Sequence, residues 1–349
     1  MIMDEILELL AHTGPEYTGG MTNHGPMAAE ALCFLGREDA AIEWVKHYKK
    51  RLVEHHVSAQ KIPLADWQEY LGKRNYFDGW KNLFDHETKS LSWESALKKW
   101  LPKLMPGIVS AAAHGVLRTA HAVRSLEAQS TPRRINELCS GLAYWASTYQ
   151  TLPQKAYNGP KLKASAAIKI VKLIPLNQRE YHDQISDGLT LLNSWTAFPP
   201  VIEMLDTSET YSECLDDILE TFVRSYISNA DTALFSALHA VTGPATLQIL
   251  AGHLEEKDKI ASLKYAWQAS AALHIATDIN APVEQYKTTK RIKNRAELID
   301  DAIRSNDEHA IKFTEVCLRL IKRSNDPIFN FAAQDATVRL AEYATNNSI

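Results

Sequence analysis

Apolar residues recur three and four positions apart along almost the whole chain, and convincing alternation of apolar and polar residues is absent from the sequence. The first spacing predicts amphipathic α-helices, whereas alternation would predict half-buried strands. Alanine, leucine, lysine and glutamate, which favour helices, are abundant. We therefore expect an all-α protein without a significant sheet. The expected helices cover residues 3–12, 26–36, 38–53, 76–86, 92–105, 108–127, 131–150, 178–193, 211–229, 231–252, 257–278, 291–305, 307–323 and 327–344.

Glycine and proline fall between these expected helices, where they favour turns. The segment 151–162 contains Pro153, Gly159 and Pro160, so we expect a surface loop or a sub-domain boundary there. No fixed-period repeat is evident. The pattern predicts one large, bundle-like domain over residues 1–349, with about fourteen helices or more.

Composition narrows the functional class. The net charge of −4 gives no general attraction to nucleic acid or to an anionic membrane. The N-terminus is acidic, unlike a signal peptide, and no apolar run approaches membrane-spanning length. Four widely separated cysteines, without a C-x-x-C pair, predict reduced and buried thiols (Cys33, Cys139, Cys214, Cys317). We expect a soluble cytoplasmic protein, as a monomer or a homodimer.

Thirteen histidines are present, and their neighbours divide them into two groups. Polar neighbours predict solvent exposure for one group (His47, His55, His56, His86, His182, His253), and His12 is left unassigned. His24 instead precedes Gly25 and Pro26 at the start of an expected helix. Because proline favours the first helical position, we expect Gly25 to be the cap and His24 to lie on a rigid turn just outside the helix. A lone histidine of this kind is more often a structural hydrogen-bonding group than a ligand or a base.

His114, Arg118 and His121 form a stripe on the expected helix 108–127. Residues four and seven apart lie on one helix face, and the rest of this helix is mainly alanine, valine and leucine. We therefore expect the stripe to be buried. Its polar groups must then be hydrogen-bonded, hydrated or metal-bound, since each lone buried polar group costs ~1–3 kcal/mol.

His239 lies in an apolar segment five residues before Pro244. Proline clashes with the carbonyl four residues back, so we expect the helix to kink or break near Ala240. The freed backbone groups would lie beside His239. Taken alone, His239 is better interpreted as a core histidine that satisfies a freed carbonyl. His274 also has apolar neighbours, and we expect it to be buried, next to the residues that would contact a bound metal rather than among them.

His309 is expected on the apolar side of the helix 307–323, together with Phe313, Val316 and Leu320. Lys312 is three residues on, at the edge of that face. Two interpretations remain open: a lysine that extends to solvent, which the sequence alone favours, or an uncharged lysine, such as a carbamate, that offers oxygen to a metal.

Imidazole suits iron, zinc, copper and nickel, and helix-bundle interiors are common places for such sites. H-E-x-x-H and Glu-x-x-His are absent from the sequence, which argues against a zincin and a ferritin-like di-iron centre. G-x-G-x-x-G, P-loop and G-x-S-x-G motifs are also absent. A histidine-rich site with few carboxylates favours redox or oxygen chemistry over hydrolysis.

Five blocks of this sequence, in order, resemble the questin oxidase-like family: 23–32, 114–124, 238–245, 265–269 and 307–312. Each block alone is weakly diagnostic, whereas the ordered set over roughly residues 20–325 is fairly specific. The histidines in these blocks are those that the residue patterns had already separated from the exposed ones.

This resemblance implies an oxidoreductase. The fungal namesakes are linked to Baeyer–Villiger-like ring opening of anthraquinone-type polyketides with NADPH, and related members are thought to use non-haem iron, histidine ligands and O2. The resemblance carries over His24, His114, His239 and His309 as metal ligands, and Lys312 as a modified-lysine ligand. It also implies that Arg118 steers an anionic oxygen and that His121 is catalytic or an alternative ligand.

The predicted function is therefore O2-dependent oxidation of a small aromatic, phenolic or anthraquinone-like substrate. We expect a non-haem iron cofactor, with zinc or manganese as alternatives, and NADPH as a candidate reductant. Two other classes remain open. One is a non-catalytic helical protein that binds a small molecule in an apolar cavity. The other is a zinc-dependent hydrolase.

Overall fold

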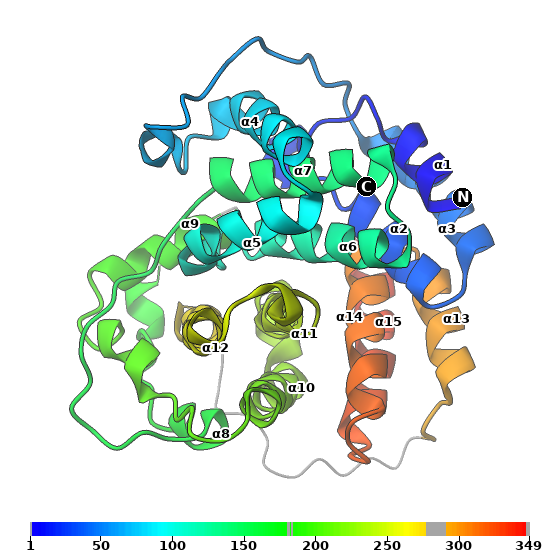
Figure 1. Cartoon of the computed structure of the whole chain (residues 1–349). Helices are drawn as coiled ribbons and strands as arrows, with labels where there is room; N and C mark the ends of the chain where they lie inside the picture. Colours follow the sequence, from blue (N-terminus) through cyan, green and yellow to red (C-terminus); the bar gives the residue numbers. More distant parts are fainter. Residues whose placement is uncertain (1, 180–181, 183, 277–290, 347–349) are drawn as a thin grey trace. The chain divides into compact units, whose positions relative to one another are not determined.

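The computed structural model describes residues 2–179, 182, 184–276 and 291–346. Within these residues it contains fifteen α-helices, and its only sheet is a short antiparallel pair, β1 (Glu16–Tyr17) and β2 (Met21–Thr22) (Figure 1). The expected all-α fold is confirmed. All four cysteines are free thiols, as expected, and Cys139, Cys214 and Cys317 are buried. The expected burial is wrong for Cys33, which is half-buried.

The chain divides into two compact units. Unit 1 consists of Met1–His56, Arg124–Glu137 and Glu284–Ile349, and unit 2 consists of Val57–Val123 and Leu138–Val283. Two helices, α6 (His114–Ala128) and α7 (Pro132–Ser147), contribute residues to both units. The loop 151–162 lies within unit 2. A single domain over the whole chain stays a prediction.

Unit 1 is built from six further helices: α1 (Ile2–Leu9), α2 (Gly25–Phe34), α3 (Glu38–Tyr48), α13 (Arg295–Ser305), α14 (Glu308–Ile321) and α15 (Ile328–Asn346). Helix α14 packs against α2, α13 and α15, and Figure 1 shows α13, α14 and α15 side by side. Asp307 starts α14, because its carboxylate accepts hydrogen bonds from the backbone N–H groups of His309 and Ala310 at 2.7 and 3.1 Å.

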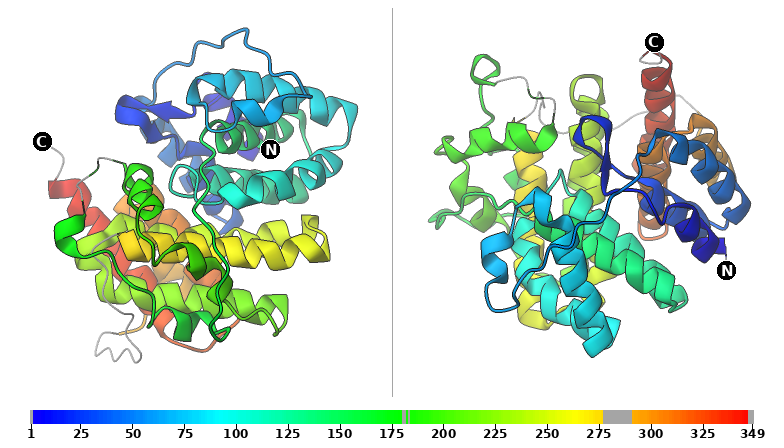
Figure 2. Two further views of the ribbon diagram at one scale, coloured as in Figure 1. Left: turned by 90° about the vertical axis from the view of Figure 1, so that its left-hand side faces the viewer. Right: turned by 90° about the horizontal axis from the view of Figure 1, so that it is seen from above.

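Unit 2 contains the long helices α4 (Phe77–Ser90), α5 (Trp93–Leu104), α10 (Tyr211–Ala245) and α12 (Glu256–Ala276), with the short helices α8 (Ala164–Ala167), α9 (Ile185–Gly188) and α11 (Leu247–Leu250). Helices α10 and α12 pack along one another (Figure 2). The 3₁₀ helices of the described chain are Thr18–Gly20, Lys49–Arg51, Trp67–Tyr70, Arg74–Tyr76, Met105–Gly107, Leu176–Gln178, Leu189–Asn193, Pro199–Met204 and Ala251–His253.

The expected kink or break near Ala240 is wrong. Helix α10 passes through Pro244 and ends at Ala245, and its only non-helical backbone angles are at Ala233. The expected helices 211–229 and 231–252 are therefore largely one kinked helix. Pro244 is tolerated because the carbonyl of Ala240, which loses its helical partner, accepts a hydrogen bond from Ser270 Oγ on α12 at 2.7 Å.

The expected helix 178–193 is also wrong. Its described residues form only the end of one 3₁₀ helix, the four residues of α9 and the 3₁₀ helix Leu189–Asn193, while residues 180, 181 and 183 lie outside the described residues. Gly188 weakens a continuous helix here, and the tertiary packing of this region decides the backbone instead.

The segment Tyr211–His253 is long and apolar enough to cross a membrane by length and composition, which the sequence pattern had not led us to expect. Its most apolar window is 78% buried inside the protein. The packing of α10 against α12 accounts for this composition.

Candidate histidine sites

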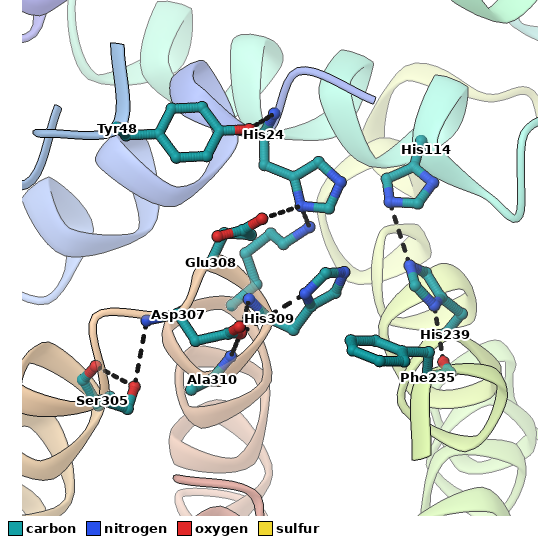
Figure 3. A network of polar contacts seen from close by, with 12 residues as sticks. His24, Tyr48, His114, Phe235, His239, Ser305, Asp307, Glu308, His309 and Ala310 are labelled. Atoms are coloured by element: carbon teal, nitrogen blue, oxygen red, sulfur yellow. Dashed lines mark hydrogen bonds and ion pairs between the residues drawn. The ribbon is translucent and has the colours of Figure 1, made fainter. Parts of the chain in front are cut away.

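Two of the predicted ligands, His114 and His239, face each other within unit 2. His114 is the first residue of α6, and His239 lies in the last two turns of α10. Their Nε2 atoms are 3.1 Å apart, and their ring centroids are 4.6 Å apart at an angle of 61° (Figure 3). Both side chains are buried.

The other nitrogen of each ring contacts a backbone carbonyl. Nδ1 of His114 is 2.5 Å from the oxygen of Ala111, and Nδ1 of His239 is 2.7 Å from the oxygen of Phe235. Because a carbonyl oxygen can only accept a hydrogen bond, each Nδ1 must be the donor and must carry a hydrogen. In two neutral rings the facing Nε2 atoms would then both present lone pairs. At 3.1 Å this arrangement requires a proton or a cation between them.

The pair fits a metal ion by geometry and by donor chemistry. Metal–nitrogen bonds of about 2.0–2.1 Å that meet at about 90–110° place the two nitrogens about 2.8–3.4 Å apart. The observed 3.1 Å lies within this range. A hydrogen bond from the opposite ring nitrogen to a carbonyl is also the usual way in which proteins orient a ligating histidine.

The remaining members of the predicted stripe, Arg118 and His121, also lie on α6 in unit 2. Both side chains are buried, as is His114, so the expected burial of the stripe is confirmed. The expected helix 108–127, however, is wrong at its start. Helix α6 begins only at His114, and Ala111, Ala112 and Ala113 before it have positive φ angles.

A second cluster in unit 1 brings together His24, His309 and Lys312. The rings of His24 and His309 lie 4.7 Å apart at 74°. Nδ1 of His24 is 3.8 Å from Oε1 of Glu308 (Figure 3). The same atom is 3.4 Å from Nζ of Lys312. A guanidinium nitrogen of Arg51 lies 3.3 Å from the other oxygen of Glu308.

His24 is held through its backbone as well as its ring. Its N–H donates to the hydroxyl oxygen of Tyr48 at 2.8 Å. The expected cap at Gly25 is wrong by one residue, because His24 is itself the cap, Gly25 begins α2 and Pro26 is the second helical residue. Pro26 is tolerated there because the N–H groups of the first helical turn have no intrahelical partner to lose. His24 thus lies just before the helix, as expected.

Lys312 does not extend to solvent, which overturns the interpretation that the sequence alone favours. Its exposed fraction is only 2%. Burial lowers the pKa of its amine to about 8, although Glu308 and Asp307 raise it. A larger fraction of this amine is therefore neutral near pH 7 than for an exposed lysine. Its modification to a carbamate stays a prediction.

The structure thus groups the predicted residues as His24, His309 and Lys312 in unit 1, and His114 and His239 in unit 2. One metal centre built from all four histidines stays a prediction of the sequence. The patterns missed Glu308, Tyr48 and Arg51. Glu308 directly precedes His309, but an acidic residue at a helix start is ordinarily explained by the helix dipole, so it gave no separate signal.

The expected exposure is confirmed for His47, His56 and His86, but it is wrong for His55, His182 and His253, which neighbouring residues partly cover. His12 is exposed. His274 is buried, as expected, with its Nδ1 3.3 Å from Ser225 Oγ on α10. This contact between α12 and α10 is separate from the His114–His239 contact.

Replacing Gly115 with alanine is expected to lower the free energy of unfolding by about 1–3 kcal/mol. A Cβ atom at Gly115 would lie 2.6 Å from the Cα atom of Trp145 on α7, so a backbone must move. The urea midpoint measures the loss. Gly252→Ala is the matched control, because no atom lies within 4 Å of its added Cβ. Equal midpoints for the two variants would contradict this close packing.

The fold and these sites define an all-α protein with buried, paired imidazoles. The family model described as Questin oxidase-like matches residues 21–317, so the chain belongs to this family. Membership indicates an oxidoreductase that acts on aromatic substrates. No curated protein matches the chain at a significant level.

Proposed function

We propose that this protein is an O2-dependent oxidase of a small phenolic or anthraquinone-like substrate. In this proposal His114 and His239 hold a non-haem metal, and iron is the favoured metal. The observation that carries the proposal is the 3.1 Å approach of the two Nε2 atoms, each opposite an Nδ1 that faces a carbonyl. Family membership supports the oxidase chemistry and the aromatic substrate class.

When bound, the iron supplies the redox chemistry with O2 that side chains lack. The protein's own part is to present neutral imidazoles. The carbonyls of Ala111 and Phe235 keep a hydrogen on each Nδ1 and leave each Nε2 able to bind the metal. Burial of both rings excludes bulk water from the pair.

Arg118 and His121 are proposed to act on the substrate. Arg118 lies one turn after His114 on the same helix face, and its guanidinium stays charged at all working pH values. It would bind the anionic oxygen of a phenolate. His121 lies on the same face and would hold or move a proton of the substrate.

His24 and His309 are proposed to hold metal as well, because the family resemblance implies that each of them is a ligand. A ring nitrogen of His24 lies within 4.8 Å of one of His309. Lys312 and Glu308 orient the His24 ring from its Nδ1 side. Glu308 is in turn fixed by Arg51.

The decisive experiment is metal analysis of the untagged protein, expressed in iron-supplemented medium. We expect near-stoichiometric iron in the parent and in the control His86→Ala, whose ring is exposed. His114→Ala and His239→Ala should each lose the iron held by this pair, so their iron content should fall below that of the parent. An iron content equal to that of the parent in both folded variants would contradict the assignment. His24→Ala and His309→Ala test the sequence prediction for these two histidines in the same assay.

Oxygen uptake with a panel of phenols and quinones then separates the reaction types. Monooxygenation consumes one NADPH for each O2, because one oxygen atom enters the substrate and the other leaves as water. Dioxygenation inserts both atoms and consumes no NADPH. Bound zinc with hydrolysis in the absence of O2 would instead support the hydrolase alternative.

The 3.1 Å contact also supports a second candidate function, a non-catalytic small-molecule-binding protein. In that case a proton lies between the two Nε2 atoms, and one of the rings is an imidazolium. This alternative predicts no metal in any sample. It also predicts that His239→Ala lowers stability without changing metal content.

A further inference from the structure

The backbone directly before His114 is unusual for its sequence. Ala111, Ala112 and Ala113 have φ angles of 48°, 54° and 70°, and the only other described non-glycine residue with a positive φ is Asn306. Alanine is the strongest helix former and disfavours the left-handed conformation. Three consecutive alanines in that conformation therefore store strain beside a predicted functional residue.

Contacts from neighbouring segments of unit 2 fix the chain around this turn. Trp145 Nε1 donates to the carbonyl of Gly107 at 2.8 Å, and the N–H of Gln150 donates to Ser110 Oγ at the same distance. On the other side, a Cβ atom at Gly243 of α10 would lie 3.1 Å from the Cβ of Ala113. A side chain at position 243 would thus press on the turn.

The turn changes what the Ala111 carbonyl can bind. In a continuous right-handed helix this oxygen would accept the N–H of Gly115, four residues on. In the observed turn it instead accepts the N–H of His114 at 3.1 Å and also meets the ring Nδ1 of His114. The left-handed turn thereby places one carbonyl oxygen against both N–H groups of the same histidine.

We propose that residues Ala111–Ala113 form a positioning turn, whose left-handed backbone keeps the hydrogen of His114 on Nδ1 and so leaves Nε2 as the metal-binding atom. The metal-binding part rests on the proposed function, whereas the position of the hydrogen does not. A turn that only connects η5 (Met105–Gly107) to α6 would place no demand on the His114 tautomer.

The test is a series of substitutions at Ala112. The residues are chosen so that the preference of the backbone for positive φ varies independently of the size of the side chain. Glycine and asparagine adopt positive φ readily, whereas valine is a strong outlier there. The tautomer of His114 is measured in metal-free, 15N-histidine-labelled protein by two-bond 1H–15N correlation spectra, assigned with His114→Asn. Cobalt(II) titration then measures metal affinity as a separate readout.

We expect Ala112→Gly and Ala112→Asn to keep the hydrogen on Nδ1, and Ala112→Val to redistribute it between the two nitrogens. Cobalt affinity should fall at least about tenfold in Ala112→Val alone, since disturbing groups that orient a ligating histidine has effects of roughly 10–100-fold. An unchanged tautomer in a folded Ala112→Val protein would overturn the proposal, as would equal loss in the glycine and valine variants.

Ala112→Gly keeps the proposal testable if the valine variant fails to fold. Because glycine relieves the strain at positive φ, this variant should raise the melting temperature. Ala120, buried in the right-handed part of α6, is the matched control, and Ala120→Gly should lower it. A fall in the melting temperature of both variants would overturn the proposal that residues Ala111–Ala113 form a strained positioning turn. A tautomer that follows the series without cobalt binding would instead reject only the proposed metal function.

Discussion

Replacing Arg124 with methionine is expected to lower the free energy of unfolding by about 3–5 kcal/mol, because it removes the cation that neutralises two buried carboxylates. Arg124 Nε and Nη2 donate to the two oxygens of Glu30 at 2.9 and 2.6 Å, and Nη1 donates to Glu315 at 2.7 Å. All three side chains are buried in unit 1. Methionine would fill much of the space but leave the carboxylates without this cation.

The same network positions the His24 cluster. Glu30 lies on α2, whose cap is His24, and Glu315 lies on α14, three residues after Lys312. Arg124 therefore ties together the two helices that carry His24 and Lys312. Arg319 also donates to Glu315 at 2.8 Å, so Glu315 keeps a neighbouring cation when Arg124 is lost. We expect the substitution to disturb the His24–His309 contact as well as stability.

Urea denaturation at pH 8 measures the effect of Arg124→Met. Arg124→Lys is the matched control, because it keeps one charge but cannot bridge Glu30 through two nitrogens, and we expect a smaller loss. The loss for Arg124→Met should shrink at pH 5, since protonation of the freed carboxylate removes its charge. A loss below about 1 kcal/mol at both pH values would mean that the network behaves like an exposed ion pair.

The all-α fold was predictable because helical periodicity is a local property, visible within each segment of the sequence. The same local reasoning separated His24, His114, His239 and His309 from the exposed histidines, and all four are buried. Small or apolar neighbours signal burial without any knowledge of the partner helix. Which atoms these residues face was not predictable in this way.

Several of the wrong predictions share a cause, because the structure there depends on residues distant in the sequence. Lys312 lies at the edge of its own helix face, and only its contact with His24 shows that α2 covers it. The helix through Pro244 survives because Ser270, on another helix, bonds the carbonyl of Ala240. The left-handed alanine turn contradicts local propensity, and such conflicts are expected at strained or functional sites.

Lowering the pH from about 6.5 to about 4 is expected to reduce stability by about 3 kcal/mol through His274 alone. Burial, and secondarily the charge of Arg179, lowers the pKa of this ring from 6.5 to about 4. Between these pH values the unfolded chain therefore binds a proton that the folded chain does not. The stabilisation is fully present above pH 6.5 and is lost as the pH falls toward 4.

The variant His274→Asn isolates this contribution, because asparagine places a polar atom near the position of Nδ1, toward Ser225 Oγ, but does not titrate. Urea unfolding from pH 4 to pH 7 should give a slope of stability against pH that is shallower in the variant than in the parent. Carboxylates contribute equally to both proteins, so the difference in slope reports His274. Asparagine is smaller and lowers stability at every pH, but this offset does not change the slope. Parallel curves of stability against pH for the two proteins would mean that His274 has the same pKa in the folded protein as in the unfolded chain. The protonated ring would then be tolerated at the contact between α10 and α12.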